Sequence, residues 1–331
     1  MKKMIYFVSL LFILLFVTGC NSNSNVTSFS SPYVGGDNGL IAEFQENHPP
    51  DEIYDNALKP FNIVLRLKND GEFKVSKDSI LIRATGFSPG DFSTTSQALT
   101  VNSLDTDLEP KAKSQDGTVR PGGQTLVSLP KNGDLAYKGN VAGTGQLSLP
   151  VSVDLCYLYK TTATTLLCVT PDLLRQSSDD VCEVNAEKQV YSSGSPVKVS
   201  KVIESSIKDK IRLDIQITFN GRGRLIKPNG NKFSSDNCDA SEYDPEIDTV
   251  YVKVDPDRQW GSVSCTSFSN SNEGYVTLFD SNGIKKGFVS CEIAINNLDK
   301  GNYVKPLNID IYYQYKEKLN KEIAIKHLEN G

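Results

Sequence analysis

The stretch Leu149–Val169, LPVSVDLCYLYKTTATTLLCV, decides the fold class, and a second stretch, Lys305–Ile325, KPLNIDIYYQYKEKLNKEIAI, repeats its pattern. The two align without a gap at an offset of 156 positions. In both, apolar residues alternate with polar ones, which is typical of a strand with one buried face. We therefore expect a β-rich protein in which the two stretches are equivalent parts of a duplicated unit.

Only the cysteines interrupt this match, since Cys156 aligns with Tyr312 and Cys168 aligns with Ala324. If each stretch is a hairpin with its turn at Thr162 in the first copy, the two cysteines lie opposite one another, within disulfide reach. Their joint absence from the second copy fits a bonded pair. The pattern therefore predicts a Cys156–Cys168 disulfide, which would stabilise the fold by about 2–3 kcal/mol.

A second match lies upstream, where FNIVLRLKNDG at Phe61–Gly71 aligns with IRLDIQITFNG at Ile211–Gly221 at an offset of 150 positions. Both segments alternate and end in turn residues. Two matches in the same order indicate a unit of about 150 residues that is present twice. The other apolar segments are short and are separated by Pro, Gly, Asn and Ser, which favours an all-β protein built from β-sandwiches. We expect one sandwich over residues 37–171, a linker over 172–190 and a second sandwich over 191–331.

The N-terminus predicts export. Two lysines precede an almost wholly apolar run, which is the pattern of a secretory signal peptide. Val17-Thr18-Gly19-Cys20 resembles a lipoprotein lipobox, and this resemblance implies cleavage after residues 1–19 and a lipid on Cys20. A plain signal peptide and a short signal-anchor helix are the alternatives. The polar segment that follows predicts a flexible tether over residues 20–36, so we expect the protein on the extracellular face of a prokaryotic cell membrane.

Composition excludes several classes of function. Without residues 1–19 the chain has 33 basic and 40 acidic residues, a net charge of −7, which argues against nucleic acid as a partner. Only two histidines are present, His48 and His327, and neither stands in a pattern typical of nucleophilic catalysis or of a metal site. We therefore expect a protein that is not an enzyme and that requires no cofactor.

Once Cys20 is assigned to the lipid, six of the seven cysteines remain. An even number is what a disulfide framework in an oxidising compartment requires. No pair has the CxxC spacing of a zinc or redox motif. Beyond the predicted first pair, three pairings are open, and we favour Cys182–Cys238 with Cys265–Cys291. The expected disulfide residues are Cys156, Cys168, Cys182, Cys238, Cys265 and Cys291.

FNIVLRLKNDGEFKV, followed by VRPGGQTLVSL, resembles the CARDB-type immunoglobulin-like modules of archaeal and bacterial surface proteins. The order of segments over residues 37–315 also resembles uncharacterised surface proteins of small-genome archaea. This resemblance implies two tandem immunoglobulin-like β-sandwiches with a role in adhesion or scaffolding. It implies no catalytic residues.

Two segments are candidate binding sites. The acidic stretch DNCDASEYDPEID offers oxygen ligands for calcium at Asp236, Asp239, Glu242 and Asp244, although a solvated acidic loop has the same composition. Trp260, the only tryptophan, together with Tyr251 or Tyr243 would form a carbohydrate platform if the rings are exposed. A single tryptophan in a sandwich more often packs into the core.

These observations favour a lipid-anchored, non-enzymatic surface protein that acts in adhesion, recognition or envelope structure. Its partners would be the membrane, through Cys20, and another surface protein or a glycan. The alternative is a carbohydrate-binding module supported by calcium. A third hypothesis is an envelope hydrolase that uses two carboxylates.

Overall fold

The computed structural model describes residues 30–141, 143, 145–170, 182–207, 209–241, 243–256, 261–295 and 303–328. Residues Pro32–Gly331 form one compact unit. Regular structure in the described ranges consists of strands and three 3-10 turns, so the all-β prediction is confirmed. The same ranges contain no helix with the length and hydropathy that a membrane crossing requires. The predicted signal peptide and Cys20 lie outside the described residues.

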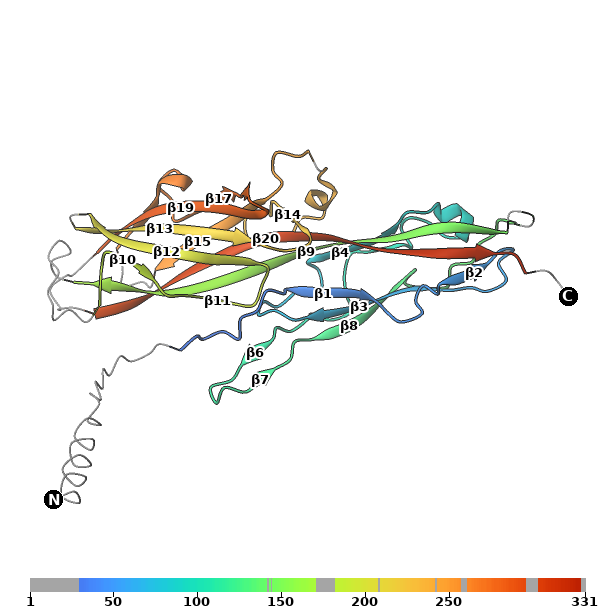
Figure 1. The fold of residues 1–331 in the computed structure, drawn as a ribbon, viewed down its shortest axis with the longest axis horizontal. Helices are drawn as coiled ribbons and strands as arrows, with labels where there is room; N and C mark the ends of the chain where they lie inside the picture. Colours follow the sequence, from blue (N-terminus) through green and yellow to red (C-terminus); the bar gives the residue numbers. More distant parts are fainter. Residues whose placement is uncertain are drawn as a thin grey trace, which may run out of the picture. The chain divides into compact units, whose positions relative to one another are not determined.

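A nine-stranded sheet forms the centre of this unit (Figure 1). Its main path runs β17-β15-β20-β9-β4-β5, while β11 pairs with β9, and β14 and β2 pair with β20. The strands of this sheet are β2 (Glu52–Tyr54), β4 (Ile80–Thr85), β5 (Thr100–Val101), β9 (Gln146–Val169), β11 (Val190–Ser192), β14 (Arg224–Ile226), β15 (Thr249–Pro256), β17 (Glu273–Thr277) and β20 (Tyr303–Lys326).

Three smaller sheets accompany it. A three-stranded sheet has the order β1-β3-β8, and a six-stranded sheet has the order β10-β12-β13-β19-β16 with β18 beside β19. The short strands β6 (Ala112–Lys113) and β7 (Val119–Arg120) pair with each other. The strands of the first two sheets are β1 (Leu40–Phe44), β3 (Ile63–Asn69), β8 (Gln124–Leu129), β10 (Ala186–Lys188), β12 (Val197–Ile207), β13 (Lys210–Phe219), β16 (Val263–Cys265), β18 (Phe279–Ser281) and β19 (Ile284–Ala294).

The two repeated stretches are single strands, and they pair with each other. β9 and β20 are each 24 residues long and run antiparallel over their whole length, from Tyr303 opposite Val169 to Lys326 opposite Gln146 (Figure 1). The predicted hairpin with its turn at Thr162 is therefore wrong. The odd-numbered residues from Val151 to Val169 are all buried, as the alternation predicts, but Ser152, Cys156, Leu158, Thr164 and Cys168 of the other phase are buried as well.

This pairing explains the offset of the repeat. Leu158 lies opposite Gln314, and these two residues are themselves 156 positions apart. A pseudo-two-fold axis between them exchanges β9 with β20. The same rotation exchanges the strands that neighbour β9 with the strands that neighbour β20. β4 beside β9 corresponds to β15 beside β20, and β3 between β1 and β8 corresponds to β13 between β12 and β19. The first part of each long strand therefore pairs within its own repeat, β9 with β4 and β20 with β15. The second part pairs with the beginning of the other repeat, β9 with β11 and β20 with β2.

The predicted domain boundaries, and the immunoglobulin-like character of each half, stay predictions. The nine-stranded sheet takes strands from both predicted sandwiches. Part of the predicted tether is bonded to the folded unit, since the backbone N–H groups of Val34 and Gly35 donate to the Glu72 carboxylate at 2.9 and 2.8 Å. Tyr33 also hydrogen-bonds to the Thr164 hydroxyl at 2.8 Å.

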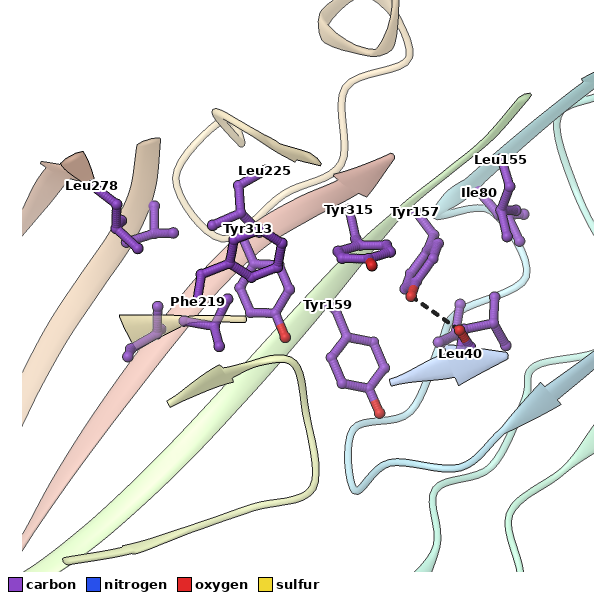
Figure 2. Packing of buried hydrophobic residues seen from close by; sticks show 14 of the residues in the cluster. Leu40, Ile80, Leu155, Tyr157, Tyr159, Phe219, Leu225, Leu278, Tyr313 and Tyr315 are labelled. Carbon is purple, nitrogen blue, oxygen red and sulfur yellow. Dashed lines mark hydrogen bonds between the residues drawn. The ribbon is translucent and has the colours of Figure 1, made fainter. Parts of the chain in front are cut away.

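Four tyrosines form the core at the pseudo-two-fold axis (Figure 2). Tyr159 lies opposite Tyr313 and Tyr157 lies opposite Tyr315, with all four rings on the buried face of the sheet. Tyr157 and Tyr315 have ring centroids 5.6 Å apart, and Tyr159 and Tyr313 have centroids 6.2 Å apart. Aromatic contacts at such distances add roughly 0.5–1.5 kcal/mol each beyond the area they bury.

The hydroxyl groups of two of these tyrosines show the duplication in detail. Tyr159 Oη accepts a hydrogen bond from the backbone N–H of Phe73 at 3.3 Å. Tyr315 Oη, in the equivalent position, accepts one from the backbone N–H of Gly223 at 2.7 Å. Phe73 and Gly223 are 150 positions apart, the offset of the upstream match. Each tyrosine thus holds the segment that follows the central strand of its smaller sheet.

Three disulfides brace the unit: Cys156–Cys238, Cys168–Cys182 and Cys265–Cys291. The predicted pairs Cys156–Cys168 and Cys182–Cys238 are wrong, because both assume the hairpin. The Cys265–Cys291 prediction is confirmed, and these two residues lie directly opposite each other on β16 and β19.

Candidate functional site

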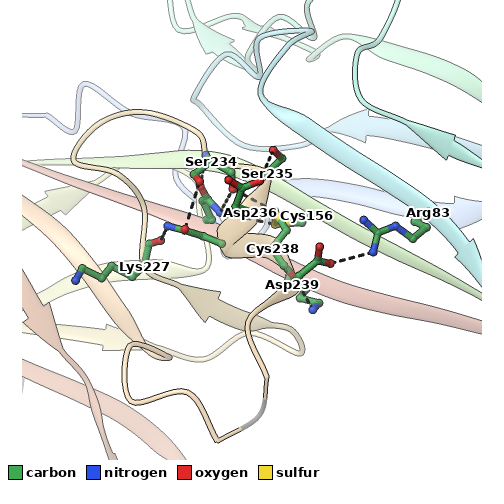
Figure 3. Close-up of a disulfide and its surroundings, with 11 residues drawn as sticks. Arg83, Cys156, Lys227, Ser234, Ser235, Asp236, Cys238 and Asp239 are labelled. Atoms are coloured by element: carbon green, nitrogen blue, oxygen red, sulfur yellow. Dashed lines mark hydrogen bonds and ion pairs between the residues drawn. A yellow bond between two sulfur atoms is a disulfide. The ribbon is translucent and has the colours of Figure 1, made fainter. Parts of the chain in front are cut away.

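The acidic segment predicted to bind calcium is docked onto the two long strands (Figure 3). It contains the 3-10 turn η3 (Asp236–Asp239), and Cys238 in this turn is bonded to Cys156 of β9. The Gln314 side chain accepts from the backbone N–H of Ser234 at 2.6 Å and donates to the Ser234 carbonyl at 3.1 Å. Lys316 Nζ donates to the Cys238 carbonyl at 2.6 Å. The segment therefore covers the pseudo-two-fold axis on the outer face of the nine-stranded sheet.

The predicted calcium ligands in this segment have separate protein partners. Asp239 pairs with Arg83 at 2.9 Å (Figure 3). Asp244 accepts the backbone N–H of Glu246 at 2.9 Å. Asp236 accepts from the Ser235 hydroxyl at 3.4 Å. Glu242 lies outside the described residues, within which no three His, Cys, Asp or Glu side chains gather as a metal site would require. The calcium site stays a prediction.

Tyr251, the predicted sugar-binding residue, belongs to a row of three tyrosines on neighbouring strands. It lies opposite Tyr275 of β17 on one side and opposite Tyr312 of β20 on the other. The rings of Tyr251 and Tyr275 meet edge to face, with centroids 5.1 Å apart and an interplanar angle of 61°. Lysines lie over both ends of the row: Lys227 is 4.7 Å from the Tyr275 ring centroid and Lys160 is 5.7 Å from that of Tyr312.

This tyrosine row is partly open to solvent, since Tyr275 is 40% exposed. Burial, followed by the nearby charge of Glu273, raises the pKa of Tyr251 to about 12. The Tyr251 hydroxyl is therefore a neutral hydrogen-bonding group at physiological pH. Trp260, the second predicted sugar-binding residue, lies outside the described residues.

One histidine has a buried partner that the sequence did not suggest. His327 Nδ1 lies 2.8 Å from Asp55 Oδ2, and the same carboxylate oxygen accepts the backbone N–H of Val141 at 2.9 Å. Among the hydrogen bonds of the described residues, none joins the other ring nitrogen to a hydroxyl or a thiol. The pair ties the end of the chain to the segment after β2.

A groove of about 430 Å³ lies between β1 and the tyrosine core, and we call it the β1 groove. Tyr157 borders it, and the Tyr157 hydroxyl donates to the carbonyl of Leu40 in β1 at 3.3 Å (Figure 2). Sequence analysis missed this groove because its walls come from distant parts of the chain. They are formed by Asp37–Glu43, Tyr157, Pro196, Asn220–Arg222, Tyr315 and Glu317.

The β1 groove contains a carboxylate without an ion-pair partner. Glu317 Oε1 is buried and has no hydrogen-bond partner among the described residues. Burial raises the pKa of Glu317 to about 7, and the Arg222 guanidinium only partly offsets this effect. Neither the Glu317 nor the Arg222 side chain forms an ion pair within the described residues. A cationic group from outside would lower the cost of ionising Glu317.

No family model matches the sequence, and no curated protein matches it. A weak structural alignment links the chain to the secreted serine protease VesC from Vibrio cholerae, with 7% identity and a TM-score of 0.17. It covers 88% of this chain and 52% of that chain, so this chain spans about half the length of VesC. The CupB6 tip adhesin from Pseudomonas aeruginosa aligns over 89% of this chain and 98% of that chain, with 9% identity and a TM-score of 0.15. At these TM-scores neither likeness carries an argument about fold or function.

Proposed function

We propose that this protein is a lipid-anchored recognition module on the extracellular face of a prokaryotic cell membrane, with another surface protein as its partner and with no catalytic role. The lipobox and the polar tether support the anchoring through Cys20. The three disulfides support an oxidising, extracellular location.

The observation that carries recognition is the β1 groove. It combines aromatic side chains, the Arg222 guanidinium and a Glu317 oxygen that has no hydrogen-bond partner among the described residues in one concave surface, which is the usual composition of a binding site. One wall is held in place by a disulfide, since β9, which carries Tyr157, is linked through Cys156 to Cys238. A rigid groove loses little conformational entropy when it binds, which favours affinity.

Photo-crosslinking on the cells that produce the protein tests this proposal. A photoreactive residue replaces Asn220, which is exposed and lines the β1 groove, and in a control protein it replaces Asp116, which is exposed beside β7. We expect a discrete adduct with a surface protein from position 220 and none from position 116. Cys20→Ser should release the protein from the membrane fraction. Equal adducts from both positions, or turnover of a cell-wall substrate by the purified protein, would contradict the proposal.

A second function, carbohydrate binding, is favoured by the tyrosine row. Three neighbouring aromatic rings with lysines at both ends offer apolar faces for sugar rings and donors for their hydroxyls. The edge-to-face angle between Tyr251 and Tyr275 leaves the row stepped rather than flat. A glycan array probed with the wild type, Tyr251→Ala and Trp260→Ala, with and without calcium, tests this function. Binding that does not depend on Tyr251 would exclude the row as the sugar site.

A further inference from the structure

The strand β1 has an unpaired edge that faces the β1 groove. Among the described strands it is terminal in its sheet and pairs only with β3. The Gly39 carbonyl accepts from Asp70, and the Gln45 N–H donates to Val64, so odd-numbered residues of this segment bond to β3. In an antiparallel ladder, the even-numbered residues then direct their N–H and C=O groups to the other edge. At Ala42 these groups point away from β3, towards the free side of the sheet.

The second repeat shows an occupied edge on the equivalent strand, where β10 pairs with Val202–Glu204, next to Val199, the equivalent of Ala42. Val202 of β12 and Phe44 of β1 are equivalent, because they pair with Ile215 and Leu65, which are 150 positions apart. β10 pairs antiparallel with β12 here, with Lys188 opposite Val202. β1 has no such partner strand among the described residues. The duplicated fold therefore already contains an example of a strand added at this edge.

The second repeat also shows a closed version of the Glu317 site. Thr161 of β9 is the equivalent of Glu317 at the offset of 156. Its hydroxyl donates to the Val197 carbonyl at 2.8 Å and lies 2.7 Å from the Ser195 hydroxyl. Val197 is in turn the equivalent of Leu40 in β1. Small polar side chains thus fill this position in one repeat, whereas the other repeat has a groove and an unpartnered carboxylate oxygen.

The charge of the groove indicates the chemistry of its occupant. Its walls contribute three carboxylates, Asp37, Glu43 and Glu317, against the single guanidinium of Arg222. Glu43 is already paired with Arg66 at 2.5 Å, and this pair is exposed. Glu317 is the carboxylate that gains most from a cation, because it is the one removed from water without a partner.

We propose that the β1 groove binds an extended peptide segment that adds as a strand to the free edge of β1 and places a lysine or arginine side chain against Glu317. Main-chain hydrogen bonds to Ala42 would supply affinity, and the carboxylate would supply selectivity. This inference rests on the proposed function, since it names the class of partner that the recognition module takes.

The test uses the mature protein and a display library of random 12-residue peptides. We expect selected peptides to share a lysine or arginine at one aligned position. Glu317→Gln should weaken the binding of a selected peptide by at least about tenfold, because hydrogen bonds to charged groups contribute roughly 1.5–3 kcal/mol. Glu46→Gln, an exposed carboxylate outside the groove, is the matched control and should leave binding unchanged.

Two further measurements test the strand addition. Ala42→Pro removes the edge N–H without breaking the β1–β3 ladder and should abolish binding, whereas Ala42→Ser keeps that N–H and should retain binding. If Ala42→Pro fails to fold, the peptide supplies the test: N-methylation at alternate residues should abolish binding in one phase and preserve it in the other.

The absence of binding peptides, selected peptides without a shared basic residue, or equal binding by Glu317→Gln would overturn the inference. Adducts from position 220 on cells with no peptide binding would leave the recognition module standing and refute only the partner class. Peptide binding by the purified protein without adducts on cells would support the peptide site and would count against the proposed function.

Discussion

Replacing Glu317 by glutamine should make the protein more stable at neutral and alkaline pH. The substitution keeps the shape of the side chain and removes the charge of a carboxylate. The Oε1 atom of this carboxylate is buried and has no hydrogen-bond partner among the described residues. In the folded protein the pKa of Glu317 is raised from 4.5 to about 7, chiefly by burial. A raised carboxyl pKa means that the folded state binds the proton more tightly than the unfolded state does. The contribution of the protonated group to stability is therefore complete below about pH 4.5 and is lost as the pH rises through about 7.

The magnitude follows from the same numbers. Each tenfold change in proton affinity corresponds to about 1.4 kcal/mol, so full ionisation of Glu317 costs on the order of 3 kcal/mol. Residual contact with solvent reduces this cost to about 2–3 kcal/mol. The stability difference between Glu317→Gln and the wild type should grow in favour of the variant by this amount between pH 4 and pH 8.

Urea unfolding of both proteins at a series of pH values measures the difference. Burial also raises the pKa of Glu204 to about 7, but Glu204 is present in both proteins and cancels in the comparison. A difference that stays constant with pH would refute the reasoning, since it would mean that Glu317 ionises as easily in the folded state as in the unfolded chain. If the stability of the wild type rises relative to that of the variant as the pH rises, Glu317 has a cationic partner.

The remaining predictions concern the scaffold. Replacing both cysteines of the Cys156–Cys238 bond by serine should cost more stability than the same change at Cys168–Cys182, because the sequence separations are 82 and 14. The chain-entropy relation gives about 4.5 and about 3 kcal/mol, and equal losses in urea unfolding would argue against it. Tyr159→Phe and Tyr315→Phe each remove the acceptor of a backbone N–H and should each cost about 1–3 kcal/mol. A loss confined to one of them would count against the equivalence of the two repeats.

The alternation of apolar residues was enough to predict the strands, because a buried face imposes a period of two on any strand. It could not distinguish a hairpin from one long strand, since a turn at Thr162 keeps the same residues on the buried face. Local chemistry held the missing signal. The segment Thr161–Thr165, TTATT, has no Gly, Pro, Asn or Asp and is rich in β-branched residues, which favours a strand that continues.

The joint absence of two cysteines from the second copy was a misleading clue. Cys156 and Cys168 are bonded to different partners, Cys238 and Cys182, which lie outside the strands in segments between β9 and β20 in the sequence. Such segments have no periodicity, so nothing in the sequence relates them to a strand position. Of the pairs that the sequence analysis favoured, Cys265–Cys291, on neighbouring strands, is the one that forms.

The β1 groove was beyond sequence analysis for a related reason. Glu317 lies on the buried phase of β20, where the pattern predicts an apolar residue, but Lys305 and Lys321 are charged exceptions on the same phase, so the pattern alone did not single out Glu317. A charged residue at a core position often marks a functional site. The opposite wall depends on β1 and on the turn after β13, and their approach is set by the pairing of β9 with β20.

The pairing of β9 with β20 is the central claim, and an engineered cross-link tests it most directly. Thr164 Oγ1 donates to Asn308 Oδ1 at 2.8 Å, so Thr164→Cys with Asn308→Cys places two thiols opposite each other on adjacent strands. Peptide mapping without reduction should recover a bond between positions 164 and 308, together with the native Cys156–Cys238 bond. Free thiols at both positions, with Cys156 bonded to Cys168, would contradict the account and restore the two separate hairpins.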